Sequence, residues 1–251
     1  MIYFTVFFRL RLNHIVNLTL KYRLKYTRDM NIILSVAFIG LFCMDYYFMY
    51  SNTIKRNPEL TEKQRAYILS IKASTTLFLI SIYFNYKFIA SGFNVDLYTS
   101  TLSSNDNFLL DLSVFNLISY LITDCYIGYN KYHKYLCTLS GYTHHIIYTF
   151  VSLTALYIKV PGLYLLFFIE ELPTVFLSSG NYNKSLRRDN IFGLTFFLTR
   201  LVYHAYLTWK FSFNKIFLIL GILSFGLHSY WFKNWFGKYF LKTNRKDIKQ
   251  E

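Results

Sequence analysis

Long apolar runs alternate with short polar connectors along this chain, a pattern that is typical of helices that cross a membrane. Each run approaches the roughly 20 residues that a helix needs to span the hydrocarbon core. None shows the alternation of apolar and polar residues that a membrane-spanning strand needs. The pattern therefore predicts an all-α, polytopic transmembrane helix bundle of about seven spans, at Met30–Tyr50, Tyr67–Ile89, Phe108–Tyr129, Tyr142–Ile158, Leu163–Ser179, Ile191–Trp209 and Phe213–Trp231.

Two places in this pattern leave alternatives open. The fourth and fifth runs are short and are joined only by Lys159–Gly162, which forms either a tight turn between two spans or a kink in one re-entrant element. We favour the turn, because Pro161 and Gly162 together mark a helix break. Near the amino terminus, either the first run is not a true span, an eighth and weaker span lies between Ile2 and Leu20, or the charge further along the chain decides the orientation.

The basic residues predict which ends of the spans face the cytosol. Connectors 51–66, 130–141 and 180–190 and the tail from residue 232 all carry Lys and Arg, so the positive-inside rule puts them in the cytosol. Seven spans then place the amino terminus on the opposite side, although the segment before the first run is itself basic. The expected organisation is a basic segment (1–29), a first transmembrane helix with its cytosolic loop (30–56), a transmembrane domain (57–231) and a basic cytosolic tail (232–251).

The composition excludes several classes of protein. Hydrophobic residues make up 54% of the chain and charged residues only 16%, too little polar surface to cover a soluble domain. The net charge of +14 does not indicate nucleic-acid binding, because the basic residues lie between apolar runs rather than on a soluble face. The cysteines Cys43, Cys125 and Cys137 have no zinc or disulfide spacing, and the 6 histidines are too few for a di-iron enzyme. We therefore expect no metal and no cofactor.

Ionisable side chains inside spans are costly, so each is a candidate for function. Asp45 and Lys72 both fall roughly 8 Å inside the cytosolic boundary and predict a structural ion pair. Glu171 and Arg200 come out roughly 13 and 15 Å deep, and predict a second ion pair. His204 is expected to form an interhelical hydrogen bond.

A further set of polar residues lies in the same cytosolic half of the predicted bundle. Adjacent histidines on a helix point about 100° apart, so only one of His144 and His145 can aim at a given pocket. A histidine beside a carboxylate is the usual arrangement for proton transfer near neutral pH. The candidate catalytic or lipid-head-group pocket therefore comprises His144, His145, Asp124 and Glu171, while His133 and His228 are expected at the membrane interface.

Several of these residues stand in motifs that resemble the TLC-domain family, which includes the ceramide synthases and the translocating-chain-associated proteins. The likeness covers roughly Asn57 to Trp231. It includes a double histidine that opens a span, a buried aspartate before it, and an acidic element and a buried arginine after it. These elements are Asn57–Tyr67, Ser119–Asp124, Gly141–Ile147, Glu170–Leu177 and Phe196–Arg200.

The resemblance implies a lipid-related role in the endoplasmic reticulum or a related endomembrane. In ceramide synthases a His-Asp pair and a further acid follow the double histidine, whereas this chain has Glu170-Glu171 and Thr174. The chain therefore looks closer to the smaller TLC-domain proteins. Two functions stay open: binding of a membrane lipid or control of lipid composition, and ceramide-synthase-like N-acyl transfer from acyl-CoA to a long-chain (sphingoid) base.

Overall fold

The computed structural model of the chain describes residues 32–136 and 138–247, and within these residues every regular element is helical. The chain divides into two compact units, each built from two segments: residues 1–57 with 86–165, and residues 58–85 with 166–251. We call them unit 1 and unit 2. The expected basic segment 1–29 and the alternative eighth span lie outside the described residues.

Five helical stretches are long and apolar enough to cross a membrane. They match the first, second, third, fifth and seventh expected runs, which confirms a membrane-type helix bundle at this coarser level. Their bounds are Ile32–Arg56, Glu62–Ala90, Ser104–Lys131, Pro161–Tyr182 and Lys215–Tyr239.

The fourth and sixth expected runs are helical as well, but each contains a π-helical segment. In the fourth, the π segment η2 (Thr138–Thr143) leads into α7 (His144–Tyr157). In the sixth, η5 (Phe197–Tyr203) is a π segment between two α-helices. π segments inside helices are rare and occur frequently at functional sites. Among the described residues, five of the seven expected runs meet the length and apolarity of a span, so the count of seven stays a prediction.

Unit 1 contains the long helix α6 and the helices that pack against it. Its elements are α2 (Ile32–Arg56), the end of α4 (Ile68–Ala90), α5 (Val95–Ser100), α6 (Ser104–Lys131), η1 (His133–Tyr135), η2, α7 and most of α8 (Pro161–Leu166). Helix α6 begins with a capping box in which Ser103 and Asp106 exchange hydrogen bonds with each other's backbone N–H groups. Asp106 also accepts a 2.6 Å ion pair from Lys87, which the sequence analysis did not predict.

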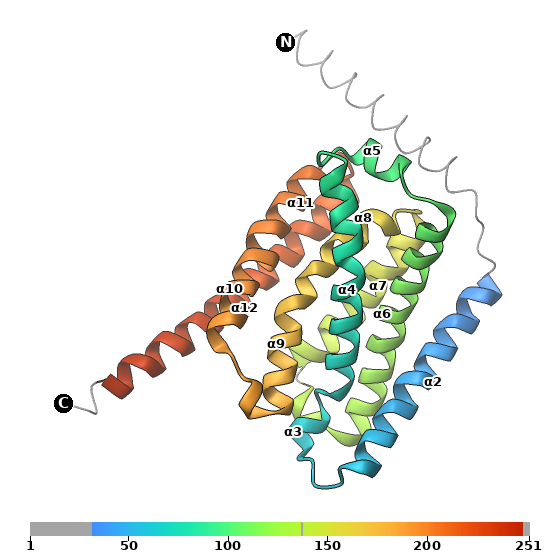
Figure 1. Cartoon of the computed structure of the whole chain (residues 1–251). Helices are drawn as coiled ribbons and strands as arrows, with labels where there is room; N and C mark the ends of the chain where they lie inside the picture. The colour runs from blue at the N-terminus through green and yellow to red at the C-terminus, as the bar shows by residue number, and fades with distance from the viewer. Residues whose placement is uncertain (1–31, 137, 248–251) are drawn as a thin grey trace. The chain divides into compact units, whose positions relative to one another are not determined.

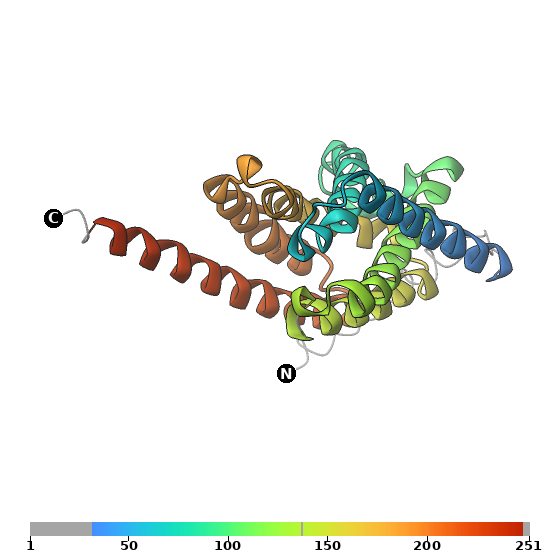
Figure 2. The same ribbon diagram turned by 90° about the horizontal axis from the view of Figure 1, so that it is seen from below.

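Helices α2 and α6 lie side by side and run parallel (Figures 1 and 2). Near their starts, the rings of Phe38 and Phe108 are 6.1 Å apart, and beyond the end of α6 the rings of Tyr50 and Tyr132 are also 6.1 Å apart. Midway, the Tyr46 hydroxyl donates to Asn116 Oδ1 at 2.9 Å. The basic end of α2 therefore lies at the same end of unit 1 as the connector after α6, as the predicted topology requires.

The connector between α7 and α8 reverses the chain. Lys159 takes a left-handed conformation with φ of 58°, and Pro161 then begins α8, where its fixed φ suits a first helical position. The hydroxyls of Ser152 and Tyr164 lie 3.1 Å apart across the two helices. This geometry agrees with the tight turn that we favoured over a kinked re-entrant element.

Unit 2 is built around α9 and α12. Its elements are α3 (Glu62–Arg65), the first part of α4, η3 (Phe167–Glu170), α9 (Glu171–Tyr182), η4 (Lys184–Leu186), α10 (Asp189–Phe196), η5, α11 (His204–Lys210) and α12 (Lys215–Asp247). Gln64 in α3 donates to the carbonyl of Tyr182 at 2.8 Å, so two of the basic connectors lie together at one end of this unit.

Helix α12 does not end where the sequence suggested. The span was expected to stop at Trp231, but the helix continues for 33 residues in all and reaches Asp247. Its last turns extend past the other helices of unit 2 (Figure 2). The tail is rich in Lys and contains no proline, so nothing in it opposes continuation of the helix.

Candidate functional site

A buried aspartate and a buried histidine meet in unit 1. The Nδ1 atom of His145 lies 3.6 Å from Oδ2 of Asp124, and the two residues are 6% and 3% exposed. Asp124 lies near the end of α6 and His145 in the first turn of α7, so the short connector between these helices brings them together. Two of the four predicted pocket residues thus lie within ion-pair distance of each other, and the Sγ of Cys125 lies 3.5 Å from the same Nδ1. A histidine near a carboxylate suits proton transfer.

Tyr132 completes this group and was not predicted from the sequence. The chain leaves the helical conformation at Tyr132, which caps α6, and its hydroxyl donates to Oδ1 of Asp124 at 2.5 Å. Gly128 makes room for this return, since a Cβ there would lie 2.6 Å from a methyl of Leu136 and 3.0 Å from the Tyr132 ring. Burial, and secondarily the neighbouring Asp124 charge, raise the pKa of Tyr132 well above its usual range. Tyr132 therefore stays protonated and acts as the donor.

The two adjacent histidines diverge, as helical geometry predicts. The ring of His145 faces Asp124 and also lies 5.6 Å from the ring of Tyr120. The ring of His144 instead lies 4.3 Å from that of Tyr148, and His144 is less buried than its neighbour. His145 is thus the member of the pair that joins the carboxylate.

In unit 2, Arg200 is held mainly by hydrogen bonds rather than by the predicted carboxylate. Its Nε donates to the carbonyl of Glu170 at 2.8 Å and its Nη2 to the hydroxyl of Thr174 at 2.7 Å. Oε1 of Glu171 lies 3.9 Å from Nη2, at the outer limit of an ion pair. The structure therefore brings Glu171 and Arg200 together, with Thr174 as a closer partner that the sequence did not reveal.

Glu170 lies at a local distortion of the helix that contains it. Pro173 cannot donate to the carbonyl four residues earlier, and its ring crowds that carbonyl, so Phe167–Glu170 adopts a 3-10 conformation. The buried Glu170 carboxylate faces two histidines: His204 Nδ1 lies 2.7 Å from Oε1, and His228 Nδ1 lies 3.6 Å from Oε2. All three side chains are of types that bind metals, and their ligand atoms lie within 4.8 Å of one another.

This second cluster was largely missed at the level of sequence. His204 was expected as an interhelical hydrogen bonder, and it does bond the carbonyl of Gly221 on α12 at 2.9 Å. His228 was expected at the membrane interface but is instead 1% exposed inside unit 2. The signal that could have found His204 is its helical face, since it is one turn from Arg200, which contacts the backbone of Glu170. The sequence carries no comparable signal for His228, which lies on a different helix.

The other predicted contacts remain predictions. Asp45 lies in unit 1 and Lys72 in unit 2, and Glu171 likewise belongs to a different unit from Asp124, His144 and His145. The structure describes each unit by itself. The single pocket containing Glu171 and the Asp45–Lys72 ion pair are therefore untested.

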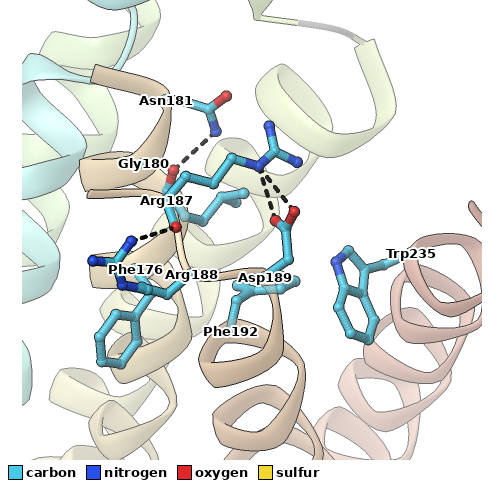
Figure 3. Close-up of a pocket in the computed structure, with 9 residues that line it drawn as sticks. Phe176, Gly180, Asn181, Arg187, Arg188, Asp189, Phe192 and Trp235 are labelled. Carbon is cyan, nitrogen blue, oxygen red and sulfur yellow. Dashed lines mark hydrogen bonds and ion pairs between the residues drawn. The ribbon is translucent and has the colours of Figure 1, made fainter. Parts of the chain in front are cut away.

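A small, open pocket with a cavity volume of about 40 Å³ lies at the basic end of unit 2 (Figure 3). The side chain of Arg187 is directed at Asp189, with Nε 2.9 and 3.1 Å from the two carboxylate oxygens. Trp235 faces this pair from α12. The pocket is lined by Phe176, Leu177, Gly180, Asn181, Arg187, Arg188, Asp189, Phe192 and Trp235.

The pocket combines a positive charge with apolar walls. Arg188 donates to the carbonyls of Ser185 and Arg187, and within the part of the chain that the structure describes no carboxylate pairs with it. One arginine is thus matched by Asp189 and the other is not, which leaves a net charge of about +1 at the mouth.

Comparisons of this chain with protein-family models, with curated proteins and with solved structures find no match. The resemblance to the TLC-domain family therefore rests on the motifs in the sequence.

Proposed function

We propose that this chain is a multi-pass membrane protein of the TLC-domain type that binds a membrane lipid with a phosphate head group. The pocket at Arg187 and Arg188 carries the proposal. A guanidinium group binds phosphate oxygens through two parallel hydrogen bonds, and among residues 32–136 and 138–247 no carboxylate pairs with Arg188. Phe176, Phe192 and Trp235 offer an apolar wall beside this charge, which suits the start of an acyl chain.

The position of the pocket in the chain supports the same function. Its arginines belong to connector 180–190, which the positive-inside rule puts at the cytosolic surface of the membrane. Phospholipid head groups lie at that level, and the cytosolic leaflet holds the anionic ones. The proposal includes seven spans, with α7 and the α10–α11 stretch crossing the membrane, and residence in the endoplasmic reticulum or a related endomembrane.

Lipid retention tests the proposal directly. The full chain is purified in mild detergent, supplied with anionic or zwitterionic phospholipid, and examined by native mass spectrometry. We expect the double variant Arg187→Gln with Arg188→Gln to retain anionic phospholipid at least tenfold less than the wild type. Lys184→Gln is the matched control, because Lys184 is an exposed cation of the same connector outside the pocket. Equal retention by all three proteins would contradict the proposal.

The second candidate function is N-acyl transfer, and the His145–Asp124 pair favours it. Asp124 would orient the imidazole, which takes a proton from the amine of a long-chain base. The amine nitrogen then attacks the thioester carbonyl of acyl-CoA, an amide bond forms, and the carbon–sulfur bond breaks to release coenzyme A as its thiol. Acyl-CoA also carries phosphates and an acyl chain, so it shares the chemistry of the proposed lipid ligand.

Turnover separates the two candidates. Purified protein is given acyl-CoA with a long-chain base, and the N-acylated product is measured by mass spectrometry. For an acyltransferase, His145→Ala abolishes product while His133→Ala, at an exposed histidine, leaves it unchanged. His144→Ala tests the adjacent histidine in the same way. If the wild type retains lipid but forms no product, only the lipid-binding function is supported.

A further inference from the structure

Glu170, His204 and His228 form a compact set of metal-binding side chains from three segments of unit 2. They come from η3, the start of α11 and the middle of α12, and their residues are 7%, 3% and 1% exposed. In a tetrahedral zinc site with bonds of about 2.0–2.1 Å, neighbouring ligand atoms lie on the order of 3.3 Å apart. Oε1 lies 2.7 Å from His204 Nδ1, Oε2 lies 3.6 Å from His228 Nδ1, and one ligand atom from each residue lies within 4.8 Å of the other two. The three side chains would therefore shift slightly to close around an ion.

The hydrogen bond on the far side of His204 decides which atom faces Glu170. The carbonyl of Gly221 can only accept, so Nε2 of His204 carries the hydrogen in their 2.9 Å contact. In the neutral ring, Nδ1 then presents a lone pair to Oε1 of Glu170 at 2.7 Å. Two acceptor atoms this close need a positive centre between them, either a proton or a metal ion.

Two observations fit a metal ion. Both histidines present Nδ1 to the same carboxylate, since His228 Nδ1 lies 3.6 Å from the other oxygen, Oε2. In addition, a metal-binding histidine almost always donates its remaining N–H to a carbonyl or carboxylate, as His204 does to Gly221. That bond fixes the tautomer and the ring orientation that a ligand needs.

The surroundings of the cluster are those of a buried site. Phe167 and Phe225 lie against His204, at ring separations of 5.2 and 6.1 Å, and Trp231 lies 5.9 Å from His228. These rings exclude water from one side of the cluster and strengthen the attraction between a cation and a carboxylate, while the Arg200 guanidinium lies against the backbone of Glu170. The neighbouring π segment η5, which ends at Tyr203, sets where His204 falls on its helix.

We infer that Glu170, His204 and His228 bind a divalent transition-metal ion, for which Zn²⁺ is the best match. Two imidazoles and one carboxylate are a ligand set of Zn²⁺, and Fe²⁺ accepts the same set. This site is separate from the Arg187–Arg188 pocket in its residues and its chemistry, so it does not depend on the proposed lipid binding. The sequence analysis expected no metal from the cysteine spacing and the small number of histidines. The three ligands themselves are spread over 59 positions without a recognisable spacing, from residue 170 to residue 228.

Metal analysis of the full-length protein in mild detergent tests the inference. After incubation with Zn²⁺ and removal of free ion, we expect about one zinc per chain by inductively coupled plasma mass spectrometry. His204→Gln and His228→Gln should each lower that content at least fivefold, while His133→Gln should leave it unchanged. His133 is the matched control because it is an exposed histidine of unit 1.

Two further measurements on the wild type cover the case in which a variant does not fold. Replacement of the ion by Co²⁺ should give the visible absorption bands of a tetrahedral or five-coordinate nitrogen and oxygen site. A chelator should lower the melting temperature, and Zn²⁺ but not Mg²⁺ should restore it, because Mg²⁺ prefers oxygen ligands. Iron in place of zinc would support the site with a different ion. Wild-type protein that takes up none of Zn²⁺, Co²⁺ and Fe²⁺, or histidine variants that keep the full metal content, would overturn it.

Discussion

The hydroxyl of Tyr132 donates to the carboxylate of Asp124 over 2.5 Å, and both residues are buried where α6 ends. Tyr132→Phe removes that donor and leaves the buried Asp124 carboxylate with one hydrogen bond fewer. We expect a loss of about 1–3 kcal/mol in the free energy of unfolding. Tyr129→Phe is the control, because Tyr129 is 71% exposed at the same end of the helix, and it should change stability by less than about 0.5 kcal/mol. Thermal unfolding in detergent measures both, and equal melting temperatures would mean that Asp124 does not need this partner.

The same hydroxyl predicts a dependence on pH. The pKa of Tyr132 is raised by folding, because burial and then the Asp124 charge disfavour the phenolate. Above about pH 10 the unfolded chain loses this proton while the folded chain keeps it, so the folded state becomes less stable as the pH rises. Tyr132→Phe has no such proton. The stability difference between wild type and Tyr132→Phe should therefore be constant up to about pH 9 and shrink towards pH 11. A difference that grows with pH would contradict the buried, protonated Tyr132.

Arg200 is expected to stabilise unit 2 through Thr174 and Glu171. Arg200→Leu leaves the half-buried Glu171 without its cation and should cost up to about 3 kcal/mol, while Thr174→Val should cost about 1 kcal/mol through the lost hydrogen bond. The double variant Glu171→Leu with Arg200→Leu should recover part of the first loss. Unfolding measurements on the full cycle give the coupling energy. If Arg200→Leu and Glu171→Leu are each harmless, both side chains are solvated and the predicted pairing is wrong.

Gly193 leaves the space that the Trp235 indole occupies in the wall of the pocket. A Cβ at position 193 would lie 2.0 Å from Cη2 of Trp235, so no alanine fits there unless the indole moves. Gly193→Ala should cost about 1–3 kcal/mol and lower the retention of anionic lipid. Gly226→Ala is the control, because nothing lies within 4 Å of a Cβ at that position of α12 and alanine favours a helix. Indole fluorescence should shift in the first variant and stay unchanged in the second.

The predicted membrane topology can be tested with single cysteines. In a background that lacks the three native cysteines, residues 55, 134 and 184 should react with a membrane-impermeant maleimide from the cytosolic side. A cysteine at Asp96, in an exposed connector at the other end of α4, should react only from the opposite side. Reaction of residue 134 from the same side as residue 96 would contradict the predicted topology and the depth estimates based on it.

The fold was more predictable than the site, for a physical reason. Long apolar runs predict membrane helices directly from the sequence. The second expected run, Tyr67–Ile89, differs from α4 by only one residue at each end. Sequence distance, however, hides which polar groups meet. Asp124 and His145 could be paired because one short connector joins their helices. His228 and Glu170 are 58 positions apart on elements that are not consecutive, so only the folded structure shows that they meet. Tyr132 was missed because it lies just outside the helix, where a tyrosine is typical of the membrane interface.

The length of helix α12 sets the depth of the Trp235 pocket relative to the membrane. Its 33 residues correspond to roughly 50 Å, and even a tilt of about 40° leaves some 38 Å along the membrane normal, more than a hydrocarbon core of about 30 Å can hold. If the charged Lys215 marks one surface of that core, Trp235, 20 residues later, stands at the other, about 30 Å away. The depth of the pocket in the membrane is then determined by the number of helical residues between Lys215 and Trp235, and not by the conformation of a loop. Inserting one turn of helix between the two residues would carry the indole about 5.4 Å out of register with its arginines.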